Sequence, residues 1–305
     1  MKENESIVLE PRAEGYSIRT RIQDYAQLTK VRLASSVVFS AIAGYLLGTD
    51  QVRISEMAIL TLGGFLVTGA ANGFNQVLER DRDALMRRTQ DRPVATGRMS
   101  IMEALLFCTL LMLGGLSLLF TLNPMSAGFG ALSIFLYTLI YTPMKAHSPW
   151  AVLIGAFPGA IPFMLGWVSA TNDFDIESGT LFAIQFLWQF PHFWAIAWLA
   201  YDDYKRAGYF LLPGRKKSKS AAYITLVYSF WLVFVSIIPV FGFTGTLTLS
   251  IPAAILLVIL GLYLVSKSWK LYRERTDKAA RKLMLTSIMY LTLLQIIYVV
   301  DKFVS

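Results

Sequence analysis

Three oxygen-bearing side chains form a regularly spaced stripe at the end of a long apolar segment. Asn75, Glu79 and Asp83 follow one another at intervals of four residues, so in a helix of 3.6 residues per turn they share one face. Carboxylates next to lipid are costly and need a partner. Amide and carboxylate oxygens are ligands that Mg²⁺ prefers. The stripe therefore predicts a magnesium site at a membrane surface.

Basic residues follow the stripe closely, at Arg87, Arg88, Arg92 and Arg98. Guanidinium groups bind phosphate through paired hydrogen bonds, and Mg²⁺ usually bridges protein carboxylates to substrate phosphates. Acids at the negative end of a helix dipole would repel a diphosphate by themselves. We therefore expect metal ions and arginines to hold a diphosphate jointly.

The composition is that of an integral membrane protein. Of the 305 residues, 55% are hydrophobic and 16% are charged, a balance that soluble enzymes rarely show. Apolar segments near the ~20 residues that a bilayer requires recur along the chain. They cover residues 30–50, 55–78, 101–121, 126–143, 149–170, 179–200, 221–243, 247–268 and 282–303. The expected fold is all-α, with nine transmembrane helices in one domain over residues 25–305, after a polar segment over residues 1–24.

The basic residues predict how these helices are oriented. Every Lys and Arg except Arg53 and Lys302 lies before or at the start of the first span, or in alternate loops on the same side and the span ends that border them. The positive-inside rule then puts the N-terminus in the cytoplasm and the C-terminus outside. We expect a multi-pass protein of the cytoplasmic (inner) membrane, surrounded by membrane lipids, with its site facing the cytoplasm. The net charge of +8 follows from this topology, and no module that binds nucleic acid is recognisable.

A second acidic cluster, Asp202 and Asp203, ends the sixth predicted span on the same side. Two acidic helix ends that lie four helices apart along the chain suggest a pseudo-repeat in which each half supplies one end. The alternative for both clusters is an ordinary helix end with local ion pairs. That alternative is stronger for the second cluster, because Lys205 and Arg206 lie beside it.

The fifth span, residues 149–170, concentrates small and helix-bending residues. It contains Gly155, Pro158, Gly159, Pro162 and Gly166. Such residues allow close packing of helices or line a cavity inside a bundle. Both interpretations stay open, and Trp167 is a candidate for the wall of such a cavity.

Polar groups inside the sixth span, residues 179–200, should face the interior. Gln189 and His192 are expensive against lipid. His192 could ligate iron, transfer a proton, or hydrogen-bond to Gln189 or a neighbouring helix. His147 is expected to be a solvated loop residue, and Lys145 in the same loop is a candidate phosphate contact.

A metal-bound diphosphate beside a deep apolar cavity predicts departure of that diphosphate from an allylic lipid. Metal ions and arginines would stabilise the leaving charge. Aromatic side chains, which make up 13% of the chain, would shelter the carbocation while an acceptor attacks it.

These motifs resemble the UbiA superfamily of intramembrane prenyltransferases. The superfamily signature Asn-x-x-x-Asp-x-x-x-Asp reads Asn75, Glu79 and Asp83 here, and further matches lie at residues 141–145, 155–167 and 188–213. The last match resembles the haem-modifying branch and not the quinone branches. The resemblance covers roughly residues 25 to 300. It departs from the family pattern at Glu79, where Asp is usual, and at Ala146 and His147, where Arg and Thr are usual.

The resemblance implies transfer of a farnesyl group from farnesyl diphosphate to the 2-vinyl group of haem B, giving haem O, with Mg²⁺ as cofactor. It assigns metal binding and catalysis to Asn75, Glu79, Asp83, Asp202 and Asp203. Candidates for the diphosphate contacts are Arg87, Arg88, Lys145 and Lys205. His192 is the candidate for haem contact, because it is the only imidazole expected within the bundle and could meet iron or a propionate. The partner implied is a haem A synthase or an oxidase assembly protein.

Two other functions are alternatives to this one. A UbiA-type prenyltransferase that acts on an aromatic quinone precursor would share the metal motif and differ in its acceptor. An ion-coupled transporter would carry acids as a relay across the bilayer. Here the acids collect at one face, which disfavours transport.

Overall fold

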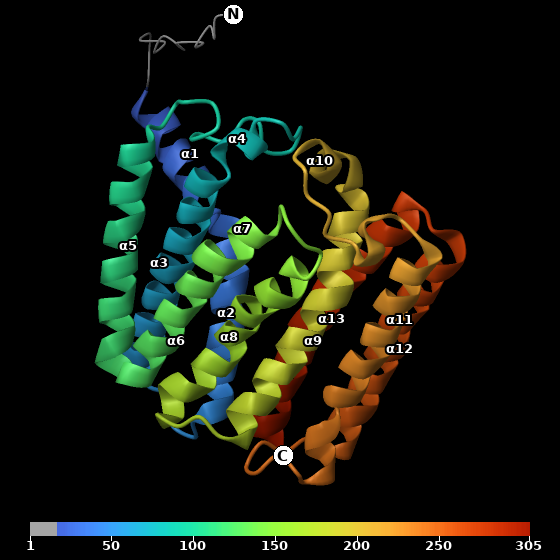
Figure 1. Ribbon diagram of the computed structural model, residues 1–305. Helices are drawn as coiled ribbons and strands as arrows, with labels where there is room; N and C mark the ends of the chain where they lie inside the picture. The colour runs from blue at the N-terminus through green and yellow to red at the C-terminus, as the bar shows by residue number, and fades with distance from the viewer. Residues whose placement is uncertain (1–16) are drawn as a thin grey trace, which may run out of the picture.

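The computed structural model of this chain describes residues 17–305, and these residues form helices and no strands (Figure 1). Residues 1–16 of the predicted polar segment lie outside the described residues. The remainder of that segment begins α1 (Ile18–Thr29), which Ser17 caps through its side chain. Lys30, in the left-handed backbone region with φ of 51°, ends α1 and leads into α2.

The expected all-α class is confirmed. The long helices are α2 (Val31–Gly48), α3 (Ile54–Leu78), α5 (Ile101–Leu122), α6 (Pro124–Phe135), α8 (Ala151–Thr171), α9 (Ile176–Leu199), α11 (Lys219–Val235), α12 (Ile251–Glu274) and α13 (Asp277–Val304). The short ones are α4 (Arg80–Asp83), a π-helix (Leu136–Tyr141), α7 (Thr142–Met144), α10 (Tyr201–Arg206) and two 3₁₀ turns (Pro213–Arg215, Ile238–Phe241).

Eight helical segments in residues 17–305 are long and apolar enough to cross a membrane. Eight of the nine predicted spans correspond to them. The remaining predicted span is α9, which has 24 residues but is not among the eight. Its apolar character is diluted by Gln185, Gln189 and His192. The count of nine spans and the orientation of the termini therefore stay predictions.

Side-chain caps fix where several helices begin. Ser100, Asn123, Ser218 and Ser250 each accept a hydrogen bond from the backbone N–H three residues later, at the start of α5, α6, α11 and α12. Such caps satisfy N–H groups that have no partner within the helix. They matter at a membrane boundary because unpaired backbone groups cannot be left in the hydrocarbon.

Small residues bring α2 and α8 into close contact. A methyl group at Gly166 would overlap the carbonyl oxygen of Ala41, and one at Gly44 would overlap the carbonyl oxygen of Phe163. Both predicted roles of the fifth span hold, at different positions. Gly166 packs against α2, whereas Gly155, Pro158, Gly159 and Pro162 line a cavity. Trp167 is buried and is not one of the residues lining that cavity.

The arrangement brings distant segments to one end of the bundle. Figure 1 shows α1, α4 and α10 at one end and the C-terminus at the other. Between them, α2 packs on α8, α8 on α9, and α9 on α13. The two acidic helix ends, which lie about 120 residues apart in the sequence, are therefore at the same end of the bundle.

The α2–α8 contact yields a stability prediction. Gly166→Ala should force the two backbones apart and destabilise the protein by about 1–3 kcal/mol, the usual cost of overpacking. Gly128→Ala is the matched control, because a methyl group at Gly128 has no neighbour within 4 Å. Melting temperatures in detergent would measure the difference. Equal melting temperatures for the two variants would contradict the close approach.

Candidate active site

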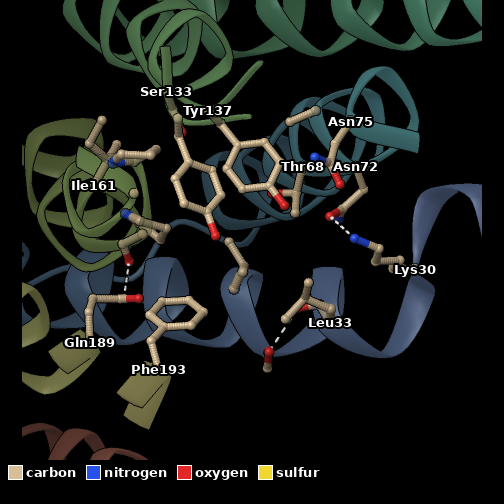
Figure 2. A pocket seen from close by; sticks show the side chains of 18 of the residues that line it. Lys30, Leu33, Thr68, Asn72, Asn75, Ser133, Tyr137, Ile161, Gln189 and Phe193 are labelled. Carbon is tan, nitrogen blue, oxygen red and sulfur yellow. Dashed lines mark hydrogen bonds between the residues drawn. The ribbon is translucent and has the colours of Figure 1, made fainter. Parts of the chain in front are cut away.

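A cavity of about 820 Å³ opens between these helices. Figure 2 shows Asn75, Tyr137, Lys30 and Gln189 around it. Its charged end, defined here as Lys30, Glu79, Asp83, Arg92 and Lys145, meets α4. Its inner wall, defined here as Gln185, Trp188, Gln189 and His192, belongs to α9. Apolar residues of α2, α3 and α8 line the space between them, among them Val37, Val67, Ile161 and Leu165.

The stripe of Asn75, Glu79 and Asp83 lines this cavity, and all three side chains are buried. The spacing predicted that they lie on one continuous helix, and that prediction is wrong. Helix α3 ends at Leu78, and Glu79 joins it to α4 with a φ of −101° and a ψ of 7°. The Asp83 N–H still donates to the Glu79 carbonyl at 2.8 Å, which keeps a helical turn through the junction. The helix is interrupted at Glu79, but all three side chains still line the cavity.

A hydrogen-bond relay couples Asn75 to the π-helix. Asn75 Nδ2 donates to Thr142 Oγ1 at 3.0 Å, and Thr142 Oγ1 donates to the Tyr137 carbonyl at 2.7 Å. A π-turn inside a helix is frequent at functional sites. Here it occurs where Tyr137 and Tyr141 line the cavity. Because Asn75 uses its NH₂ group for Thr142, its Oδ1 is the atom available to a cation.

Glu79 forms a buried ion pair with Lys145 and accepts a hydrogen bond from the Tyr209 hydroxyl at 2.6 Å. Burial raises the pKa of Glu79, but the Lys145 ammonium and the hydrogen bonds outweigh it, so its pKa is lowered. Burial lowers the pKa of Lys145 against the attraction of Glu79. The Glu79 side chain is therefore held as a carboxylate between a cation and a phenol.

Asp83 pairs with Arg92, whose Nη1 lies 2.6 Å from Asp83 Oδ2. Its other oxygen, Oδ1, is buried and has no hydrogen-bond partner in the described chain. Burial raises the pKa of Asp83, and Arg92 opposes that shift. A buried acceptor without a partner is unusual in a folded protein. It fits a site that completes its contacts with a ligand.

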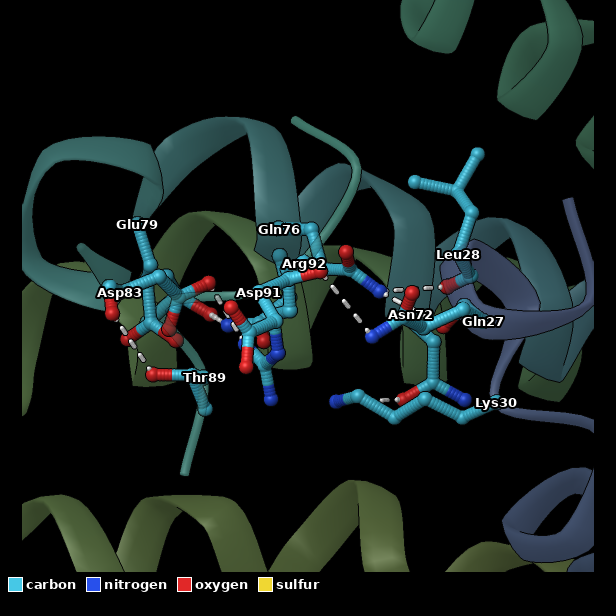
Figure 3. A network of polar contacts seen from close by, with 12 residues as sticks. Gln27, Leu28, Lys30, Asn72, Gln76, Glu79, Asp83, Thr89, Asp91 and Arg92 are labelled. Carbon is cyan, nitrogen blue, oxygen red and sulfur yellow. Dashed lines mark hydrogen bonds and ion pairs between the residues drawn. The ribbon is translucent and has the colours of Figure 1, made fainter. Parts of the chain in front are cut away.

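Lys30 is the third cation of the charged end, and it was not among the residues predicted for the site. Its Nζ donates to Asn72 Oδ1 at 3.3 Å. Figure 3 shows Lys30, Asn72, Arg92, Asp83 and Glu79 gathered in one polar network. A lysine at the start of an apolar segment is ordinarily read as a topological charge, so the sequence carried no separate signal for it. Tyr209 was missed for the same lack of a signal.

The candidate diphosphate contacts divide into two pairs. Arg88 and Lys145 line the cavity, whereas Arg87 and Lys205 are exposed and are not among its lining residues. The segment around α10 contributes Tyr204 and Tyr209 to the wall instead.

Asp202 and Asp203 do not line the cavity in the described structure. Asp202 is exposed, and Asp203 forms an ion pair with Arg206 inside α10. The local pairing that the sequence left open is therefore present at this second cluster. A role for the two acids in metal binding stays a prediction. Their segment does reach the first cluster, since Arg206 Nε donates to the Leu85 carbonyl at 3.3 Å.

Two side chains of the inner wall form hydrogen bonds with the backbone of α8. Gln189 Nε2 donates to the Gly159 carbonyl at 2.9 Å, and Gln185 Oε1 accepts from the Phe163 N–H at 3.2 Å. These bonds lie beside Pro158 and Pro162, each of which removes an N–H donor from the helix. His192 lines the same wall, whereas His147 is not one of the lining residues. Gln189 and His192 therefore face the interior, as the sequence predicted.

The donor set at the charged end suits Mg²⁺ that arrives with a phosphate ligand. No group of three or more His, Cys, Asp or Glu side chains in residues 17–305 is arranged to hold a metal. Mg²⁺ is commonly bound by one or two carboxylates together with water and substrate phosphates. Asp83 Oδ1 and Asn75 Oδ1 are oxygens of that kind, beside three cations that would contact an anion.

A helical membrane bundle whose cavity joins a charged end to an apolar interior defines a class of membrane enzyme that handles amphiphilic substrates. The UbiA prenyltransferase family matches residues 37–294. The chain belongs to this family.

Individual relatives agree with that assignment. The chain is 50% identical over 289 residues to a protoheme IX farnesyltransferase of Flavobacterium psychrophilum, covering 94% of this chain and 96% of the relative. In fold it is similar to a digeranylgeranylglyceryl phosphate synthase structure, with a TM-score of 0.76, 18% identity and coverage of 92% and 98% of the two chains. A UbiA homologue of Archaeoglobus fulgidus bound to GPP and Mg²⁺ gives a TM-score of 0.62, 13% identity and coverage of 91% and 99%.

Lys30 makes the charge of this end depend on pH. Burial, with Arg92 and Lys145 nearby, lowers the pKa of Lys30 to about 7. Below pH 7, Lys30 is already protonated before an anion binds. Above pH 7, Lys30 is mostly neutral, so it must take up a proton when the anion binds. The Lys30 contribution to anion affinity should therefore fall as pH rises through 7, by up to about tenfold per pH unit.

Calorimetry of magnesium diphosphate binding at about pH 8, in two buffers of different ionisation enthalpy, measures this proton uptake. The native chain should take up more protons than Lys30→Arg, because a guanidinium remains charged. The ligand's own titration is common to both proteins. Equal uptake by both would contradict the assignment.

Proposed function

We propose that this chain transfers a farnesyl group from farnesyl diphosphate to the 2-vinyl group of haem B. Water adds to the product, giving haem O and free diphosphate. The observation that carries the proposal is the cavity itself, which joins a cationic, acid-bearing end to an apolar interior and an imidazole. A relative that is 50% identical over 289 residues is named protoheme IX farnesyltransferase, which supports haem as the acceptor.

The charged end would bind the diphosphate. Lys30, Arg92 and Lys145 are buried or partly buried cations of the cavity wall, and Arg88 lies at its rim. Arg87 and Lys205 are outer candidates. Asn75, Glu79 and Asp83 would hold Mg²⁺, and Asp202 and Asp203 would have to be released from local contacts to join them. When bound, Mg²⁺ supplies positive charge to the departing diphosphate.

The chain's own residues would protect the allylic cation that remains. Tyr137 and Tyr141 line the cavity beside the charged end, and Lys145 Nζ lies 4.8 Å from the Tyr141 ring centroid. Aromatic faces stabilise a desolvated cation by about 2 kcal/mol or more. The apolar stretch of α2, α3 and α8 would hold the farnesyl chain and exclude water until the vinyl group attacks.

The proposed setting is the cytoplasmic (inner) membrane, with the charged end facing the cytoplasm. The distribution of Lys and Arg supports this orientation, because the loops at α4 and α10 carry most of the basic residues between spans. Haem O leaves as a membrane-soluble product. A haem A synthase or an oxidase assembly partner would receive it.

Mass spectrometry of extracted haems after incubation with farnesyl diphosphate, haem B and Mg²⁺ tests the acceptor. We expect a haem that has gained one farnesyl group and one water. A matched incubation with an aromatic quinone precursor in place of haem B should give no prenylated product. Prenylation of the aromatic acceptor alone would replace this proposal with the quinone branch.

Asp83→Asn tests the charged end. The substitution keeps an oxygen for Arg92 but removes the charge from the unpartnered Oδ1, so turnover should fall about 100-fold or more, a change of about 3 kcal/mol in activation free energy. Asp81→Asn is the matched control, since Asp81 is exposed and pairs with its neighbour Arg80. It should keep native turnover. Near-normal rates for Asp83→Asn in saturating Mg²⁺ would remove Asp83 from the site.

A further inference from the structure

The contacts of His192 favour one of the two tautomers of its neutral ring. His192 Nδ1 lies 2.9 Å from Ser287 Oγ of α13. Ser287 Oγ donates its own hydrogen to the Met284 carbonyl at 2.7 Å. With its one proton on that carbonyl, the hydroxyl acts as an acceptor toward His192. This arrangement favours Nδ1 as the N–H donor, and in that neutral tautomer Nε2 carries the lone pair.

The same serine also holds a second aromatic side chain against His192. Trp188 Nε1 donates to the Ser287 backbone carbonyl at 2.6 Å. The Trp188 and His192 rings stack with centroids 4.5 Å apart and an interplanar angle of 16°. Residues four apart in α9 therefore share one anchor on α13. The Ser287 hydrogen bond and the stacked Trp188 ring together restrict rotation of the His192 imidazole.

Other polar groups nearby are engaged elsewhere. Gln185 and Gln189 hydrogen-bond to the backbone of α8. Gln295 and Ser40 hydrogen-bond to each other across α13 and α2, with Gln295 Nε2 3.0 Å from Ser40 Oγ. Among the cavity-lining residues of the described chain, His192 supplies the only imidazole. Its Nε2 is therefore the nitrogen lone pair that the inner wall offers to a metal.

We propose that Nε2 of His192 ligates the iron of the haem substrate, and that Ser287 and Trp188 are positioning residues for this ligand. The proposal rests on the proposed function, since it takes haem as the acceptor. Metal-bound histidines in proteins almost always donate their other ring N–H to an acceptor that fixes the tautomer and raises ligand basicity. Here the acceptor is a hydroxyl whose proton is committed to a carbonyl.

Ligation at one point would restrict how the porphyrin lies in the cavity. A ring held through its iron can turn about the Fe–N bond, and the cavity walls then select the rotation that brings a vinyl group toward the charged end. His192 would thus contribute to the choice of acceptor position by orienting the substrate. It takes no part in removing the diphosphate.

Resonance Raman spectroscopy of the full chain with ferrous haem B tests the proposal. The native protein should show an iron–histidine stretching band. His192→Ala should lose the band, and added imidazole should restore it. Farnesyl diphosphate binding by His192→Ala reports that the variant is folded.

Variants of the anchor separate positioning from packing. Ser287→Ala should keep the band but shift it to lower frequency, because Nδ1–H loses its acceptor, and should weaken haem binding about tenfold. Trp188→Phe, which keeps a ring but removes the indole N–H, should weaken haem binding less. Ser268→Ala is the matched control, since Ser268 is a buried helical serine bonded to Ser229 and away from the cavity. It should leave band and affinity unchanged.

The outcomes distinguish this proposal from the proposed function. Native protein that farnesylates haem without an iron–histidine band overturns the ligand assignment alone, whatever the variants do. A band that persists in His192→Ala without imidazole does the same. An unshifted band and native affinity in Ser287→Ala overturn the role of Ser287. Native protein that neither binds nor modifies haem overturns the proposed function itself.

Discussion

The buried ion pair of Glu79 and Lys145 is the constraint on which the charged end depends. Removing two charges from water is costly, and their attraction offsets that cost only with good geometry and further hydrogen bonds. Tyr209 supplies one of those bonds. The three residues come from the end of α3, the loop after α7 and the segment after α10. Removing one partner of such a pair typically costs about 3–5 kcal/mol, so the pair holds three distant segments at one point.

Once that pair is formed, the remaining charges are unequal. Asp83 is left to neutralise Arg92 and Lys30, and one of its oxygens stays without a partner. With Lys30 protonated, the charged end therefore combines surplus positive charge with an anionic oxygen that has no partner. A diphosphate would neutralise the positive charge, and a metal ion would give the oxygen a partner. Under the proposed function, a diphosphate that carries Mg²⁺ would do both.

The sequence predicted the parts of the site that depend on local spacing. Asn75, Glu79 and Asp83 were expected on one face, and they do line one cavity, although the helix breaks at Glu79. The helical class and most spans followed from apolar length alone. Long-range pairings were out of reach. Nothing in the spacing of Tyr209 indicates that it meets Glu79. The pairing of Asp203 with Arg206 is local, and the sequence had left it open as an alternative.

Lys30 and α9 show a second limit of prediction from sequence: composition and position along the chain do not reveal which way a side chain faces. A charge at the start of a span has the same appearance whether it faces lipid headgroups or turns into a cavity. Likewise, the polar residues of α9 line the cavity and also lower the mean hydropathy of the helix, so the same side chains that face the cavity make α9 a poor span by composition. Side-chain direction decides both cases, and direction depends on which helices become neighbours.

The two regions of the cavity handle polarity in opposite ways. At the charged end, groups are left with capacity for a ligand. On the inner wall, Gln185 accepts from the Phe163 N–H and Gln189 donates to the Gly159 carbonyl, so these two backbone groups of α8 are paired within the protein. Neither of the two groups therefore needs water or a ligand as a partner. Under the proposed function, the charged leaving group would lie at the end with free capacity and the apolar carbon chain would lie beside the wall whose polar groups are already paired.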